Sequence, residues 1–183
     1  MRWDELFSDL ESQLEQHEAA ELSAEVSDRT RREVGALRLC DRLGPSRGAQ
    51  LTIALTGTAP VSGALTDVGA DWLLLEEAGR KELLISSDAV LSVAGLSSAT
   101  EVQTGEVWRR LDMRWALRGL ARSRTAVEVL LRDGSSWYGT LDRVGADHVE
   151  LAEHPAGEQR RRGAVRQVVL LPVAAITAVR NRP

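Results

Sequence analysis

The sequence predicts an α+β fold, mainly β, with two tandem five-stranded, strongly bent antiparallel barrels, each preceded by a helix, and an acidic amphipathic helix at the N-terminus. Three observations predict it: a long segment is repeated, each copy alternates apolar with polar residues as short strands do, and each second strand contains a glycine where a bent strand needs one. The N-terminal helix, the first helix with its barrel, a linker, and the second helix with its barrel and a basic insertion are expected at residues 1–20, 21–96, 97–105 and 106–183.

The repeat is clearest around the sequence Val-Gly-Ala-Asp, which occurs once in each copy. The offset between the copies is 76 residues there, from Gly69 to Gly145. Farther along, Ile85 corresponds to Leu171 with an offset of 86 residues. The second copy therefore contains an insertion of ten residues, which falls within 154–166.

Short apolar or alternating runs bounded by turn residues predict ten strands, and helical spacing of apolar residues predicts three helices. An Asp-Gly pair, Asp133-Gly134, predicts a hairpin turn in the second copy. Helices are expected over 3–14, 21–43 and 106–122, the last apolar on two sides, with Trp115 in one apolar sector, and so packed between two bodies. The expected strands are 51–55, 61–67, 72–76, 82–85 and 89–93, then 127–131, 137–143, 149–152, 168–171 and 175–179.

The N-terminal helix has one apolar face and several acidic residues on its other faces. Its apolar residues also follow the spacing of a heptad, which is typical of helices that bind a partner helix. Packing on the chain's own barrels is the alternative. The candidate partner-binding residues are Trp3, Phe7, Leu10 and Leu14.

The composition excludes several classes of protein. Apolar residues make up 43% of the 183 residues and charged residues 27%, as in ordinary globular proteins. No apolar run approaches the roughly 20 residues that span a bilayer, and the acidic start lacks the pattern of a signal peptide. The single cysteine, Cys40, cannot form an internal disulfide. We therefore expect a cytoplasmic protein that does not contact a membrane.

Charge is distributed unevenly along the chain. The net charge is −5 over residues 1–44, −4 over 45–105 and +5 over 106–183, although the whole chain is at −4. A site for a polyanion is therefore expected in the last third of the chain.

Two groups of arginines in that last third are candidate nucleic-acid-binding residues. One forms a stripe along the predicted helix, and the other lies in the basic insertion, where several phosphates would be neutralised together. The alternatives are salt bridges to the acidic N-terminal helix for the stripe and a solvated loop for the insertion. The candidates are Arg110, Arg114, Arg118, Arg160, Arg161, Arg162 and Arg166.

Two aspartates and two histidines are further candidates for ligand binding. Asp71 and Asp147 each follow Gly-Ala before a strand, where an aspartate commonly bonds nearby backbone N–H groups, although a ligand-binding role is the alternative. His148 and His154 lack a third residue to complete a metal site, so we expect both on the surface.

Motifs for catalysis are missing from the sequence. There is no Ser-His-Asp or Cys-His arrangement with supporting context, no phosphate-binding glycine loop and no pair of metal ligands. We expect no enzymatic activity, no cofactor and no small-molecule substrate. Trp137 and Tyr138 are adjacent on a strand, so one of them faces outward, where it stacks on a base or packs on a neighbouring element.

The order of a helix and five short strands resembles the Sm-like (LSm) family, whose fold is a small, bent, SH3-like barrel. In the second copy the resemblance rests on Asp133-Gly134 before a strand that contains Gly139 and Leu141 and is followed by Val144. Members of this family typically bind RNA and assemble as rings, in which strand four of one subunit pairs with strand five of the next.

The usual nucleotide pocket of the family is not carried over. The family normally has an Asp and an Asn soon after the second-strand glycine, and the matching stretches, 68–72 and 144–148, contain Asp71 and Asp147 but no Asn. The basic residue and glycine before the last strand are replaced by residues 85–88 and 171–174. The whole chain also resembles a group of actinobacterial proteins, a resemblance that adds no activity.

Two functions remain open at this point. The first is a non-enzymatic, RNA-associated binding protein that uses the arginine-rich surface of the second copy. The alternative is a protein-interaction adaptor or homo-oligomeric scaffold that binds no nucleic acid. The localised positive charge favours the first, and the overall negative charge favours the second.

Overall fold

The computed structural model describes residues 27–32, 34–96, 111–155 and 165–181. Leu39–Pro183 form one compact unit, and the residues before it form a separate unit. The helix expected over 21–43 is not continuous in the described part, because residues 36–38 leave the helical conformation before α2 (Leu39–Leu43) begins.

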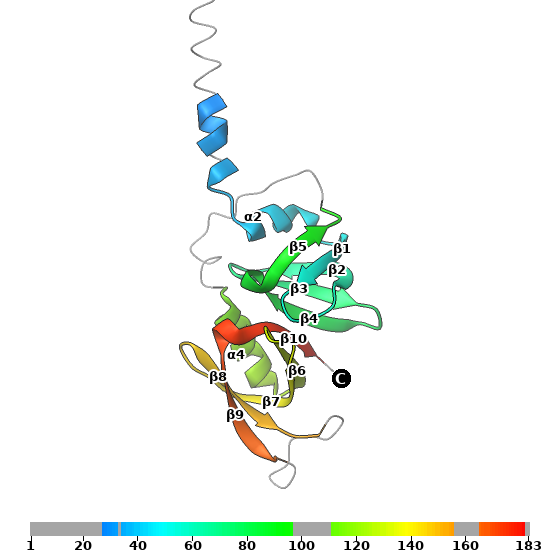
Figure 1. Ribbon diagram of the computed structural model, residues 1–183, viewed down its shortest axis with the longest axis vertical. Helices are drawn as coiled ribbons and strands as arrows, with labels where there is room; N and C mark the ends of the chain where they lie inside the picture. Colours follow the sequence, from blue (N-terminus) through cyan, green and yellow to red (C-terminus); the bar gives the residue numbers. More distant parts are fainter. Residues whose placement is uncertain (1–26, 33, 97–110, 156–164, 182–183) are drawn as a thin grey trace, which may run out of the picture. The chain divides into compact units, whose positions relative to one another are not determined.

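The compact unit is mainly β, as the sequence predicts (Figure 1). Short 3-10 turns, η1 (Gly44–Ser46), η2 (Ser87–Ala89) and η3 (Val173–Ala175), join some of its elements. Its strands are β1 (Gln50–Leu55), β2 (Val61–Val68), β3 (Trp72–Glu77), β4 (Lys81–Ser86), β5 (Val90–Ala94), β6 (Ala126–Leu131), β7 (Ser136–Val144), β8 (His148–Glu153), β9 (Gln167–Pro172) and β10 (Ile176–Asn181). They match the ten predicted strands to within two residues at each end.

All ten strands belong to one antiparallel sheet. Its order is β5-β1-β2-β3-β4-β10-β6-β7-β8-β9. Each half of the sheet therefore has the same order, with its own fifth strand beside its first and its fourth strand last. The two halves are joined where β4 pairs with β10, which lies between them in Figure 1.

The halves are alike in hydrogen bonding as well as in strand order. Each second strand has a bulge where it pairs with the third, after Leu65 in one half and after Leu141 in the other. Three backbone hydrogen bonds of the first half have a counterpart in the second. Thr56 N–H donates to Ala89 O as Arg132 N–H does to Ala175 O, and Gly69 N–H donates to Trp72 O as Gly145 N–H does to His148 O. Ser87 N–H donates to Asp71 O as Val173 N–H does to Asp147 O. The sequence repeat is thus a repeat of structure.

A glycine is required in each second strand because that strand lies very close to the third. A Cβ atom at Gly63 would collide with the carbonyl oxygen of Glu76, and one at Gly139 would collide with that of Ala152. Neither obstacle is a flexible side chain that could move aside. This close approach explains why each bent second strand contains a glycine, as the sequence predicts.

Two clusters of buried apolar residues make up the core, one in each half. The joining strands contribute to both clusters, because successive side chains of a strand point to opposite faces. Leu83 and Ile85 of β4 belong to the first cluster, and Leu84 belongs to the second. Ala178 and Val179 of β10 are divided in the same way. The joint is therefore buried on both faces.

Helix α4 (Met113–Ser123) packs on the core of the second half. Asp112 is its N-cap and accepts a hydrogen bond from the backbone N–H of Trp115 at 2.8 Å. Met113 and Leu117 are buried, whereas the Trp115 side chain is 47% exposed. The prediction of a helix covered on two sides is therefore wrong, since α4 buries one face and Leu111 precedes its first turn.

Candidate functional site

The joint between the halves is a short antiparallel pairing of apolar strands. Ile85 of β4 lies opposite Ala178 of β10, and Leu84 lies opposite Val179. All four side chains are at most 5% exposed. A strand that is buried on both faces needs apolar residues at successive positions, and β4 has them.

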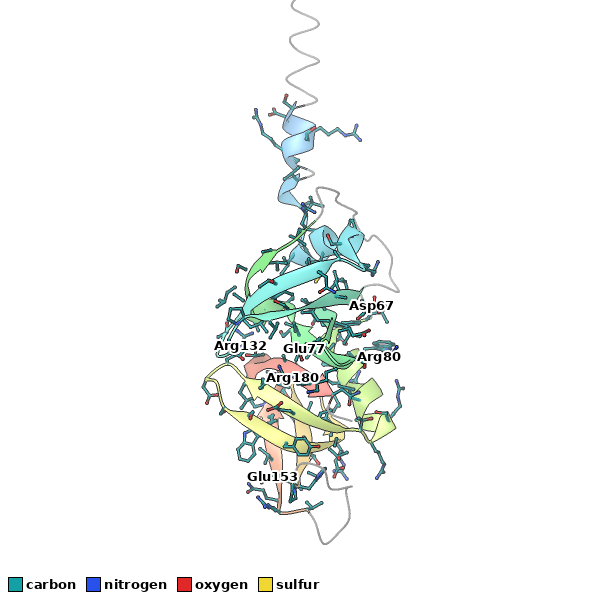
Figure 2. All side chains as sticks on the ribbon, turned by 90° about the vertical axis from the view of Figure 1, so that its right-hand side faces the viewer. Asp67, Glu77, Arg80, Arg132, Glu153 and Arg180 are labelled. Atoms are coloured by element: carbon teal, nitrogen blue, oxygen red, sulfur yellow. The ribbon has the colours of Figure 1, made fainter. Side chains whose placement is uncertain are left out.

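An ion-pair network fixes one end of the joint. Arg180 of β10 donates from Nε to Glu77 Oε2 at 2.9 Å and from Nη1 to Glu128 Oε2 at 3.2 Å. Burial disfavours the charge of Arg180, but the hydrogen bonds and attraction of the two carboxylates outweigh it, so the Arg180 pKa is raised. Figure 2 shows Glu77 and Arg180 close together between the halves. The network links residues from both halves.

The loop between β2 and β3 holds the start of α4. Asp71 Oδ1 accepts a 2.6 Å hydrogen bond from the backbone N–H of Met113, and Trp72 Nε1 donates to Leu111 O at 2.8 Å. Burial raises the Asp71 pKa, and the hydrogen bond from Met113 only partly offsets it. The Asp71 carboxylate therefore caps a distant helix, and the prediction that it bonds its own turn is wrong.

The equivalent loop of the second half lies between β7 and β8, and its aspartate has another partner. The Asp147 carboxylate lies 2.8 Å from His148 Nδ1 and is 90% exposed. This hydrogen bond lowers the Asp147 pKa. The two equivalent aspartates thus have different partners, because Asp71 accepts from the start of α4 whereas Asp147 bonds the neighbouring His148.

The expectation of two surface histidines is half right. His148 is partly exposed, but His154 is buried. Its Nε2 lies 2.9 Å from Thr140 Oγ1, and its ring meets the ring of Tyr138 edge to face. Trp137 packs against the core of the second half. Among the described residues, no group of three potential metal ligands comes together.

The predicted arginine stripe is only partly brought together. Arg114 forms an ion pair with Asp112 at 2.5 Å and donates to Ala146 O at 3.1 Å, so its charge is compensated within the protein. Arg118 is exposed one turn farther along α4, and Arg166 is exposed just before β9. The remaining candidates lie outside the described residues: Arg110, Arg160, Arg161 and Arg162, and the partner-binding set Trp3, Phe7, Leu10 and Leu14.

Arginines from two elements instead surround an open cleft between α4 and β7. Its volume is about 450 Å³. Arg118 and Arg122 come from α4, Arg124 follows the helix, and Arg143 comes from β7. Among the described lining residues the only acid is Asp142. The sequence places Arg118 and Arg122 one helical turn apart, with Arg124 just beyond them, but Arg143 comes from a strand, which no local pattern connects to the helix.

Apolar side chains are exposed at both ends of the sheet. Val168 and Leu170 of β9 are 59% and 61% exposed, and Leu91 of β5 is 69% exposed. Among the described strands, β5 and β9 each have one neighbour. These three residues were not among the sites predicted from the sequence, although the repeat and the apolar run of β9 were signals that pointed to them.

Comparison with known proteins finds no family model that matches the chain and no curated protein that matches it. In the described part of the chain, every helix is too short or too polar to cross a bilayer.

Proposed function

We propose that the chain is a non-enzymatic RNA-associated protein built from two Sm-like units, and that it binds single-stranded RNA on the exposed face of α4. The repeated five-strand order and the glycine in each bent second strand support the Sm-like assignment. The observation that carries the function is an exposed tryptophan beside an arginine-lined cleft.

The exposed face of α4 combines a stacking surface with positive charge. Trp115, Arg118 and Arg122 are three and four residues apart, so they lie on one side of the helix. A tryptophan that is 47% exposed on a helix leaves much apolar surface in contact with water. Aromatic rings of this kind stack on unpaired bases, whatever the base, at about 1–3 kcal/mol per base.

Positive charge exceeds negative charge among the described residues that line the cleft, where four arginines accompany one acid, Asp142. Arg118 and Arg122 are spaced i, i+4, so their repulsion opposes helix formation. Arg143 approaches Glu150 only at 3.8 Å and its side chain is 80% exposed. Phosphate groups would relieve this repulsion and would release counterions when they bind.

Single strands fit this surface better than duplexes do. In a duplex the bases are stacked on one another, so a ring such as Trp115 has no base face to contact. The arginines would follow the backbone while Trp115 takes a base. Arg160, Arg161 and Arg162 of the basic insertion stay a separate sequence prediction for RNA contact.

Fluorescence anisotropy with a labelled single-stranded RNA of mixed sequence tests the proposal. The double charge reversal Arg118→Glu with Arg122→Glu should weaken binding at least tenfold. It should also make the plot of log affinity against log salt less steep, by about 0.7 for each phosphate that the variant no longer neutralises. Trp115→Ala should weaken binding by about tenfold, with little change in salt dependence.

A matched control has the same charge change on the first half. Arg80 and Lys81 are both exposed where β3 turns into β4. Reversal of both charges should leave the affinity within about twofold of the wild type if binding is local to α4. An equal loss of affinity in the control and the α4 variant would mean that only overall charge matters, and tighter binding of duplex than of single strand would contradict the proposal.

A further inference from the structure

The arginine-lined cleft between α4 and β7 has a counterpart in the first half that carries far less positive charge. The repeat, with its offset of 76 residues, relates each cleft arginine to a residue of the first half. Arg118 corresponds to another arginine, Arg42. The other three, Arg122, Arg124 and Arg143, correspond in that order to Ser46, Gly48 and Asp67. The repeated fold therefore does not require the positive charge of the cleft.

Arg124 has a backbone conformation that arginine rarely adopts. It ends α4 with a φ of 52°, in the left-handed region. Glycine is usual at such a position, because a Cβ atom makes this conformation less favourable. The counterpart of Arg124 follows that rule, since Gly48 has a φ of 85°. The second half thus has a cationic side chain lining the cleft at a position where the fold itself favours glycine.

The difference at Arg143 also adds positive charge. Its counterpart Asp67 has its Oδ1 atom 3.5 Å from Arg47 Nε and accepts a hydrogen bond from the backbone N–H of Val68. The Asp67 charge is therefore balanced by its neighbours in the first half. The Arg143 side chain is 80% exposed, and its contact with Glu150 is long, at 3.8 Å. Arg143 is thus placed to bind an anion from solvent.

Four guanidinium groups around one cleft suit an anion whose charge is concentrated. The cleft volume of about 450 Å³ lies in the range of sites that hold small molecules. Each phosphodiester of an RNA strand carries a single charge, and a ribose separates it from the next. The phosphates of a triphosphate instead share bridging oxygens, so several charges and many acceptor oxygens lie close together. Guanidinium groups bind such oxygens in pairs, with strong, charge-assisted hydrogen bonds.

We propose that this cleft binds the 5′-triphosphate end of a single-stranded RNA, an assignment that rests on the function proposed above. RNA synthesis leaves a triphosphate on the first nucleotide of a transcript, so this group and unpaired bases occur on one molecule. Trp115 lies three residues before Arg118 on the same side of α4, and it is not among the residues that line the cleft. It is therefore free to stack on a base while the arginines hold the end group.

Fluorescence anisotropy with three RNAs of one sequence tests this assignment. Each RNA carries its label at the 3′ end, and the 5′ end is a triphosphate, a monophosphate or a hydroxyl. The triphosphate RNA should bind at least about tenfold more tightly than the hydroxyl RNA, with the monophosphate RNA between them. Equal affinities for all three would overturn this assignment and leave the proposed function standing, whereas a failure to bind any of them would overturn both.

A double variant tests whether the cleft makes this distinction. Arg124→Gly restores the residue of the first half and relieves the left-handed conformation, and Arg143→Ala removes an exposed side chain, so the variant should fold and should not melt at a lower temperature. It should bind triphosphate RNA less than about threefold more tightly than hydroxyl RNA. An unchanged preference would overturn the assignment to this cleft.

A matched control removes the same charge from the first half. Arg80 also has a left-handed conformation, with a φ of 59°, and Arg80 and Lys81 are exposed. Arg80→Gly with Lys81→Ala should keep the preference for triphosphate RNA, and an equal loss of preference in this control would show that only overall charge matters. Adenosine triphosphate should displace the RNA only at far higher concentration, because it lacks the strand. Displacement at an equal concentration would contradict recognition of an RNA end.

Discussion

The joint inside the chain and the two ends of its sheet are built from equivalent strands in different surroundings. Leu84 and Leu170 occupy equivalent positions, yet one is buried and the other is 61% exposed. Arg180 has two carboxylate partners, whereas Ala94 in the equivalent position has no charge to pair with one. Equivalent strands thus form a buried pair at the joint and exposed edges at the two ends of the described sheet.

Equivalent residues of the repeat therefore differ in what they contribute to stability. An apolar residue at the joint contributes to the stability of every copy, because it belongs to a core. Its counterpart at the sheet end is mostly exposed and should contribute little to the stability of the isolated chain. Mutations at equivalent positions should therefore change the free energy of unfolding by different amounts.

The largest expected effect comes from an acid in the internal joint. Leu84→Asp buries an unpaired charge in the second core and should lower the free energy of unfolding by about 4 kcal/mol or more. Leu170→Asp should change it by less than about 0.5 kcal/mol under conditions where the protein is monomeric. Denaturant unfolding measures both, and equal losses of stability would contradict the comparison.

The ion-pair network should have the next largest effect. Arg180→Ala leaves Glu77 and Glu128 close together and mostly buried, which should cost about 2–3 kcal/mol of unfolding free energy. Arg143→Ala is the control, since its contact is long and exposed, and it should cost less than about 0.5 kcal/mol. A cost for Arg180→Ala no greater than for this control would mean that the network does not stabilise the joint.

The cap that connects the first half to α4 should matter less. Asp71→Ala removes the acceptor for Met113 N–H and should cost about 1 kcal/mol. Asp71→Asn keeps an acceptor and should cost less. Because the Asp71 pKa is raised, the folded state holds this proton more tightly than the unfolded state does, so this carboxyl makes the protein less stable as the pH rises above 3.8. Asp71→Asn should reduce that dependence in unfolding measured from about pH 3 to 7, and an unchanged dependence would contradict this role.

The strands were predictable because their signal is local. Short apolar or alternating runs between turn residues located all ten strands, and the repeat supported each one by a second copy. Asp133-Gly134 located a turn, in which Asp133 Oδ1 accepts a hydrogen bond from Ser135 N–H at 2.9 Å. These features depend on a few neighbouring residues, which a sequence shows directly.

Pairing between distant segments was not predictable in the same way. The joint between β4 and β10 unites residues that the chain separates widely, and no local pattern fixes their register. The Asp71 carboxylate bonds a residue 42 positions farther along, so its role as a helix cap was missed. Trp115 was assigned to a buried face because helical spacing shows a face without showing what covers it.

One signal of the joint was present in the sequence and was not used. Leu83, Leu84 and Ile85 are apolar at successive positions, as expected for a strand buried on both faces. The run from Val168 to Leu171 has the same character. It marks a strand with two apolar faces, one of which the isolated chain leaves exposed.

Amide hydrogen exchange tests the central comparison most directly. The N–H groups bonded between β4 and β10 should exchange only on global unfolding, because both strands are paired and buried on both faces, whereas the outward-facing N–H groups of β5 and β9 should exchange much faster. Equal protection of the joint and of the two sheet ends would contradict the comparison.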